Sequence, residues 1–582
     1  MNQSKKPALT HQERLRQLAE MRRKILSIPS EKAMAAVLEH PQPAALVHSF
    51  PEEDLHFLIY HVGLEDALPL IRLASNRQWE FFLDLETWHR DQLDFQQATK
   101  WLQLLVEADP NRLANWCFGE KLEFLEFYLH RNIELRIRDS DETPTDFGNG
   151  YFSDDDTFYV RLLEYPAATP EEKTFVEHRN IMLGKLLKRL SILDHPRYQG
   201  LLLEAVNLIP SEIEEELFRL RNVRLAEKGF LPFDEAIGVY QPMEPDDIGS
   251  RGKKIIHPSS TDGSLLPAPL FTSGFLEGDN LFVRALKTVA EPHVVQLLQT
   301  EFASLCNQLI SADQTIIRDR EQLHSVVGKA GHYLSIGLER LTLQETRSRE
   351  KSASDQLHLH LLTDIFRIGF GEAMKLKWKA EGWHPKSWVK EKGIGLPFWD
   401  EAFLGVLGGL LLQTPKYYLP SGSPSKYRDF QTLEEIESTG RKLQQILAVD
   451  RVLKAIDPIF ESISPNRLMT YKNLLLTLWA GSIVEPSQAD ARPTATELPL
   501  DAFKNFFEQL WTEEQGKRII GNEKKAAFLS WVAERSGMAT EVLSEELGIV
   551  FEALFSDIEA ELAAVKIGNL DPRYVHLFLL RR

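Results

Sequence analysis

The chain has 582 residues, of which 43% are hydrophobic, so it can bury a large core and should contain several domains. Its formal net charge of −18 at pH 7 argues against a body that binds nucleic acid. Its two cysteines, Cys117 and Cys306, are too few for a disulfide framework and suit a reducing cytosol.

The N-terminal segment predicts a soluble, cytoplasmic protein. Residues 1–26 contain no apolar run of the kind that a signal peptide needs. The longest apolar run, 403–412, is too short to cross a membrane, so no transmembrane segment is expected. Gly405, Gly408 and Gly409 within this run predict a buried helix that packs tightly against a neighbour.

Four consecutive 12-residue units begin at Leu38, Phe50, Val62 and Ala74. A short helix that cannot bury its own apolar stripe must stack on its neighbours. The units therefore predict a superhelical, solenoid-like array of helices. The ninth and tenth places of the units hold apolar pairs, which we expect to be buried: Leu46-Val47, Leu58-Ile59, Leu70-Ile71 and Phe82-Leu83.

Two segments, 133–138 and 158–162, alternate apolar and polar residues with the period of a β-strand. Between them lies an acidic stretch that is rich in turn residues, including Pro144, Gly148 and Gly150. This pattern predicts a small β-hairpin excursion in a chain that is otherwise mainly α-helical.

The periodicity and the stretches rich in Pro, Gly and Ser predict a division of the chain into regions. In the central domain, we expect helices over about 280–346, with a break, and over 355–380. The predicted regions are an N-terminal helical repeat region (1–130), an acidic hairpin-like excursion (131–165), a helical region (166–241), a linker or long loop (242–274), a central helical domain (275–484), a linker (485–497) and a C-terminal helical region (498–582).

The hairpin carries the densest group of carboxylates in the chain. Oxygen ligands of this kind are what Ca²⁺ and Mg²⁺ prefer, but their spacing fits no EF-hand loop. A solvated acidic loop explains the pattern better, so no metal site is expected. A regulatory module that responds to divalent cations is an alternative function, with candidate ligands Asp139, Asp141, Asp154, Asp155 and Asp156.

Two Glu-x-x-His pairs have the spacing of half a carboxylate-bridged dimetal site. They are Glu53 with His56 and Glu321 with His324, and chance explains such pairs in a chain with 17 histidines. No phosphate-binding loop and no activated nucleophile is recognisable, so no cofactor is expected.

If residues 355–380 form one helix, His360, Asp364 and Arg367 share one of its faces. A histidine oriented by an aspartate can act as a general base. An enzyme with its site in the central helical domain, between Glu321 and Lys379, is therefore a further alternative function.

Residues 375–392 are basic in an acidic chain, with six lysines and two glutamates. Three tryptophans interleave with the lysines, a mixture that suits docking to an anionic partner or a membrane surface. A lysine-rich helix end whose tryptophans cover the core would give the same pattern. The partner-binding candidates are Lys377, Trp378, Lys379, Trp383, Lys386 and Trp388.

Several motifs carry a family resemblance. The runs RNVRLAEKGF (221–230) and PFDEA (232–236), with GYF (150–152), DD (155–156) and YRDF (427–430), resemble an uncharacterised bacterial family with a domain of unknown function. That resemblance covers most of the chain and implies no activity. Residues 38–85 separately resemble the superhelical intracellular N-domain of magnesium transporters and, more loosely, helical modules of the flagellar motor switch. This second resemblance implies a fold element and not ion transport.

These patterns together predict a non-catalytic scaffold built on stacked helices. Stacked helical repeats usually bind partners, and the expected partner is another protein. The sequence carries no signal for a particular oligomeric state.

Overall fold

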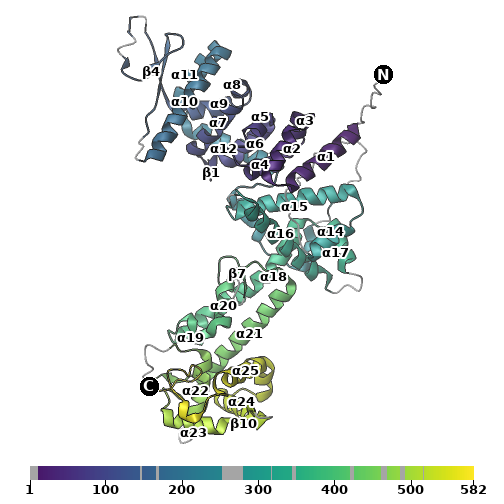
Figure 1. Cartoon of the computed structure of the whole chain (residues 1–582), viewed down its shortest axis with the longest axis vertical. Coiled ribbons are helices and arrows are strands. Elements are labelled where there is room, and N and C mark those ends of the chain that lie inside the picture. The colour runs from purple at the N-terminus through teal and green to yellow at the C-terminus, as the bar shows by residue number, and fades with distance from the viewer. Residues whose placement is uncertain are drawn as a thin grey trace. The chain divides into compact units, whose positions relative to one another are not determined.

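The computed structural model describes residues 11–139, 141–143, 147–165, 169–251, 254, 279–315, 317–343, 349–419, 425–460, 468–484, 492–514 and 517–581. Helices make up 70% of it, which confirms the expected mainly α-helical fold (Figure 1). The chain divides into two compact units, Met1–Arg367 and Ile368–Arg582. Within the described residues, none of the helices has both the length and the apolar character that a membrane span requires.

The repeat region forms short helices that contact one another at alternating positions: α2 contacts α4, α3 contacts α5, and α4 contacts α6. All eight residues of the apolar pairs are buried, so the expected register of the repeats is confirmed. Ser75 and Gln78 form a capping box that starts α6. The helices are α1 (His11–Ser27), α2 (Ser30–Leu38), α3 (Pro43–His48), α4 (Glu52–Val62), α5 (Leu68–Leu73) and α6 (Asn76–Glu86).

The core of the repeats continues without interruption into the helices that follow. Three of these helices start with an aspartate or a threonine whose side chain accepts a hydrogen bond from one of the first free backbone amides. A proline follows one or two positions later, where its missing amide proton costs nothing. The elements are β1 (Trp88–His89), β2 (Gln92–Leu93), α7 (Phe95–Ala108), α8 (Pro110–Gly119), α9 (Leu122–His130), α10 (Pro170–Leu193), α11 (His195–Asn207) and α12 (Pro210–Ala226).

The β-hairpin excursion lies between α9 and α10. Strands β3 (Ile133–Ile137) and β5 (Phe158–Leu162) pair antiparallel, with Leu135 opposite Val160, which confirms the expected pairing. A short third strand, β4 (Tyr151–Phe152), extends the sheet on the far side of β5. Residues 140 and 144–146 of the acidic stretch lie outside the described residues.

The rest of the first unit is again helical. The predicted loop at 242–274 begins with a 3-10 helix, η3 (Pro245–Arg251), and from 255 onward it lies outside the described residues. The elements are α13 (Phe233–Ala236), η2 (Ile237–Tyr240), α14 (Leu281–Thr288), α15 (Pro292–Ala312), α16 (Arg320–Thr342) and α17 (Arg349–Leu359). The boundary between the two units falls within the next helix, α18 (Leu362–Trp383).

The expectation of one helix over 355–380 is wrong. The chain breaks between α17 and α18, so His360 stands outside the helix that carries Asp364 and Arg367. The break has a packing cause, because α17 lies against α14 and α16. At the start of α18, the carbonyl of Ile365 lies so close to Gly337 of α16 that no side chain would fit there. Tertiary packing therefore overrides the helical periodicity.

The second unit is a helical bundle with small strand pairs. Gly405, Gly408 and Gly409 pack tightly, as expected, and their neighbours are Tyr418 and Tyr427. Its helices are α19 (Trp388–Glu391), α20 (Asp400–Leu410), α21 (Leu433–Ile456), α22 (Tyr471–Val484), α23 (Leu500–Leu510), α24 (Asn522–Ser536) and α25 (Thr540–Leu562), and its strand pairs are β6 (Tyr417–Tyr418) with β7 (Tyr427–Arg428), β8 (Ile459–Phe460) with β9 (Thr494–Ala495), and β10 (Trp511–Glu514) with β11 (Lys517–Ile520).

Candidate functional site

A cavity of about 460 Å³ lies inside the first unit. Its walls come from α4, α6, β1 and α7, from Phe230 beyond the end of α12, from α15, and from the segment that leads into α16. This volume is within the range of small-molecule sites in proteins. The cavity, which the sequence did not predict, is the candidate functional site.

One helix supplies the largest share of the cavity's polar groups. Glu53, His56, Phe57 and Tyr60 of α4 all line it. Their spacing of three and four residues places them on one face of the helix. The first eight residues of α4 (52–59), including its acidic first turn, are all buried.

His56, Tyr60 and Glu86 form a hydrogen-bonded group in the wall. The His56 Nε2 lies 2.7 Å from Glu86 Oε1, and the Tyr60 hydroxyl donates to Glu86 Oε2, also at 2.7 Å. Burial and the charge of Glu86 raise the pKa of Tyr60. Burial alone would raise the pKa of Glu86, but its bonds to His56 and Tyr60 hold that pKa below its usual value. A carboxylate that orients an imidazole in this way can support proton transfer.

Glu53 is a buried carboxylate that shares its counter-ion. The ammonium of Lys228 lies 2.6 Å from Glu52 Oε2 but 3.3 Å from Glu53 Oε2. Burial therefore raises the pKa of Glu53 by more than the positive charge of Lys228 lowers it. Glu52 has a second cation, Arg77, at 2.7 Å. The negative charge of Glu53 is therefore less well neutralised by nearby cations than that of Glu52. Glu53 is also the glutamate that lines the cavity.

Asn307 of α15 contributes an acceptor that has no protein partner. The residue is fully buried and lines the cavity. Its Nδ2 donates to the carbonyl of Lys228 at 2.8 Å, whereas its Oδ1 has no hydrogen-bond partner among the residues that the structure describes. An unpaired buried acceptor costs about 1–3 kcal/mol, so such a group calls for a specific explanation.

The run at 221–230 holds this side of the cavity in place. Arg224 binds the carboxylate of Asp84 on α6, and Lys228 binds the first turn of α4. Gly229 has a φ of +87°, and a Cβ there would lie 2.6 Å from the carbonyl oxygen of Ser304 on α15. Phe230 then reaches the wall, with its ring 6.1 Å from that of Phe81.

The polar groups of the cavity are separated by depth. Glu53 and Asn307 are buried, whereas His89, Lys100 and Arg318 are exposed residues of the lining and mark its mouth. Rings form much of the surface between the two, including the buried Phe57, Phe81 and Phe230. The site therefore has an acidic, acceptor-rich floor, aromatic walls and a basic rim.

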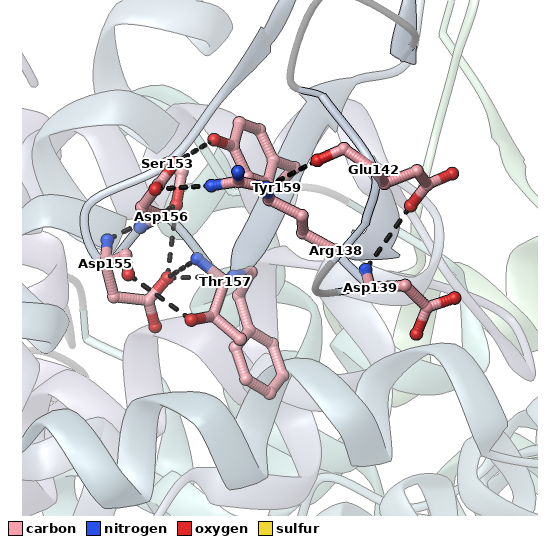
Figure 2. Close-up of polar contacts among 9 residues, drawn as sticks. Arg138, Asp139, Glu142, Ser153, Asp155, Asp156, Thr157 and Tyr159 are labelled. Carbon is pink, nitrogen blue, oxygen red and sulfur yellow. Dashed lines mark hydrogen bonds and ion pairs between the residues drawn. The ribbon is translucent and has the colours of Figure 1, made fainter.

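The acidic hairpin is held together by its own donors (Figure 2). Asp155 accepts hydrogen bonds from the backbone amides of Thr157 and Phe158, at 2.9 and 2.8 Å. Beyond the hairpin, the side chains of Gln199 and His195 on α11 also bind Asp155. Asp156 accepts from Arg138 and Tyr159.

The other three candidate ligands of the hairpin, Asp139, Asp141 and Asp154, are exposed. In the part of the chain that the structure describes, no three His, Cys, Asp or Glu residues are grouped so as to hold a metal ion. The carboxylates of Asp155 and Asp156 serve the turn itself and its attachment to α11.

The Lys/Trp segment is divided between interior and surface. Trp388 is buried, Trp383 donates to Asp450 at 3.0 Å, and the buried Lys377 donates to the carbonyl of Leu412 at 2.7 Å. The exposed members of the segment are Trp378, Lys379 and Lys386.

The remaining predicted site residues do not join the cavity. Glu321 and His324 are exposed on α16, where it is Leu323 between them that lines the cavity. The break before α18 removes His360 from the proposed face, whereas Asp364 and Arg367 stay together on α18, with Arg367 Nη1 3.5 Å from Asp364 Oδ1. Arg367 also donates to the carbonyl of Gly238 at 2.8 Å.

The fold and this cavity define a mainly α-helical protein with an internal site of ligand size. The chain belongs to DUF6178, a family of unknown function, whose model matches residues 10–581. The expected membership of such a family over most of the chain is thereby confirmed. Neither a curated protein nor a solved structure matches the chain.

Proposed function

We propose that this protein binds a small organic molecule in the cavity of its first unit. The observation that carries the proposal is Asn307, a fully buried residue of the cavity wall whose Oδ1 has no partner among the described residues. A cavity with apolar walls and a few convergent polar groups is the usual form of a small-molecule site. A ligand that donates to Oδ1 would remove the cost of burying it unpaired.

Protein binding is the second candidate function. The alternating contacts of α2 to α6 are those of stacked helical repeats, and we infer a superhelical array whose surface binds another protein, in a bacterial cytoplasm. The resemblance of residues 38–85 to a transporter N-domain supports this inference. Because α4 and α6 also line the cavity, a bound ligand would stiffen the same helices.

The test uses Nile red, an uncharged dye that fluoresces in apolar sites. We expect the wild-type protein to bind the dye saturably. Leu64, which is partly buried in the turn after α4, lines the cavity, so Leu64→Trp should fill part of it and weaken dye binding at least tenfold. Leu38→Trp introduces the same ring at an exposed position and should leave binding unchanged. Absence of dye binding, or equal binding by both variants, would reject the proposal.

A further inference from the structure

We propose that the ligand of this cavity is a compact organic monoamine, whose ammonium group donates hydrogen bonds to Glu53 and Asn307 while its apolar body lies among the rings. This inference rests on the proposed function, and it names the chemical class of the ligand. The argument starts from the hydrogen-bonding capacity of the floor.

On the floor and the wall beside it, the donor groups Asn307 Nδ2, His56 Nε2 and the Tyr60 hydroxyl already have partners, whereas Asn307 Oδ1 has none among the described residues. Asn307 Nδ2 is committed to the carbonyl of Lys228, so the amide orientation is fixed. The flipped amide would place Oδ1 against that carbonyl, which also accepts, so the atom left over must be the acceptor. In the wall, the His56 Nε2 and the Tyr60 hydroxyl are both taken up by Glu86. An ammonium group, with three donors and no acceptor, matches such a floor.

Charge points to the same class of ligand. Lys228 stands closer to Glu52 than to Glu53, and burial keeps the pKa of Glu53 above its usual value. A second anion beside Glu53 would add repulsion to a carboxylate that is already buried. A cationic ligand would neutralise the part of the Glu53 charge that Lys228 leaves unneutralised.

Glu53 and Asn307 can act on one group, because they belong to a single contact network. The side chain of Lys228 binds Glu53, and its backbone carbonyl binds Asn307. Gly229 seats this segment directly against α15, so the backbone carbonyl that holds Asn307 is fixed by close packing. Such pre-organisation reduces the entropy that a ligand loses on binding.

The walls and the mouth refine the class. Phe57, Phe81 and Phe230 present aromatic surface, which attracts a cation and accommodates an apolar body. Lys100 and Arg318 at the rim would repel a second positive charge. The structure therefore favours one amine over a diamine or polyamine.

Three probes of nearly equal shape test this class by calorimetric titration of the full chain: 2-phenylethylamine, 2-phenylethanol and 3-phenylpropionate. We expect the amine to bind at least about tenfold more tightly than the alcohol, and the carboxylate to give no measurable binding. Titrations of the wild-type protein are enough to decide whether the site prefers an amine, so this test does not require that any variant folds correctly.

Two adjacent glutamates provide matched variants. Glu53→Gln removes the charge on the floor, and it should bring the amine to within about twofold of the alcohol while Nile red still binds. Glu52 is the other partner of Lys228, but it does not line the cavity. The Glu52→Gln variant should therefore still prefer the amine to the alcohol by at least fivefold.

The outcomes separate this inference from the proposed function. If Nile red binds in the cavity but the amine binds no better than the alcohol, or not at all, the amine inference is wrong and the ligand site stands. A preference for the carboxylate would overturn it in the same way. If Nile red does not bind, both are rejected.

Discussion

The guanidinium of Arg224 donates two hydrogen bonds, of 2.7 and 2.8 Å, to the carboxylate of Asp84, which lies 140 residues earlier in the chain. Asp84 is buried on α6, and its backbone carbonyl accepts a further bond from Arg221. This clamp fixes α12 against α6, and so it helps to position Lys228 beside Glu53 and Phe230 in the cavity wall.

Asp84→Asn should destabilise the first unit by about 2 kcal/mol. The amide keeps the shape of the side chain but leaves Arg224 without its bidentate charged partner, and hydrogen bonds to charged groups contribute about 1.5–3 kcal/mol. Urea unfolding followed by circular dichroism measures the change. The matched control is Glu216→Gln, which breaks the exposed pair of Arg219 and Glu216 on α12, the helix that also carries Arg224. This change should leave the unfolding midpoint unchanged. Equal effects would show that the clamp does not hold α12.

Leu70→Ala should destabilise the repeat region by about 2–5 kcal/mol, because Leu70 is fully buried and the substitution leaves a cavity. Thermal unfolding reports the loss. Leu38→Ala removes the same atoms from a side chain that is 41% exposed, and its effect should be much smaller. An unchanged transition for Leu70→Ala would contradict the packing of the repeats described above.

Gly229→Ala should cost at least about 2 kcal/mol, because the position combines a left-handed backbone with contact to the backbone of Ser304. Nile red binding should weaken as well, since Phe230 would be displaced from the wall. Gly184→Ala, in the open middle of α10, should instead stabilise the protein by up to about 1 kcal/mol. Normal stability and normal dye binding in Gly229→Ala would refute the close approach to α15.

Charge reversal in the Lys/Trp segment should separate its buried members from its exposed ones. Lys377→Glu places an acid beside Glu381 and the carbonyl of Leu412, and it should destabilise the second unit by about 3 kcal/mol. Lys379→Glu alters an exposed residue two positions further on and should leave the melting temperature unchanged. If Lys377→Glu is equally harmless, the lysine is free for a partner, as the sequence first indicated.

Acid should weaken the attachment of the hairpin to α11 through Asp155. Burial alone would raise the pKa of this carboxyl, but hydrogen bonds from Phe158, Gln199 and Thr157 outweigh burial and hold the pKa below its usual value. A group with a depressed pKa contributes stability that is complete above its unfolded pKa, about 3.9, and is lost as the pH falls below that. Unfolding free energies at pH 5 and pH 3 should therefore differ less for Asp155→Asn than for the wild type. Equal differences would exclude Asp155 as a contributor.

The repeat register could be predicted from the sequence because it depends on local periodicity. Leu58-Ile59 and Leu70-Ile71 recur at a fixed spacing, and any stacking of the helices that they lie on buries them. The strands of the hairpin were predictable for the same reason, since alternation of apolar and polar residues with a period of two is typical of a strand. The break at His360 was not predictable, because the contacts on either side of it, α17 with α14 and Ile365 with Gly337, join segments that are distant in the chain.

The cavity could not be predicted, because its floor joins residues that are far apart in the chain. Glu53 and Asn307 are 254 positions apart in the chain and both contact Lys228, and no local pattern reports those contacts. One signal was present. The Glu53-x-x-His56 pair looked like half of a metal site, and its residues do share a buried polar face of α4, where Glu86 binds the imidazole. The family motif at 221–230 contained the residues that build the wall but gave no indication of what they contact.

Cys117 and Cys306 are both fully enclosed, and burial raises the pKa of the Cys117 thiol to about 12 and also raises that of Cys306. The thiolate is the species that reacts with maleimides and oxidants, so neither residue should be modified while the fold is intact. A single cysteine introduced at the surface can therefore carry a fluorophore or a spin label without removal of the native pair. Conversely, the rate at which the two native thiols become reactive measures how fast the first unit opens.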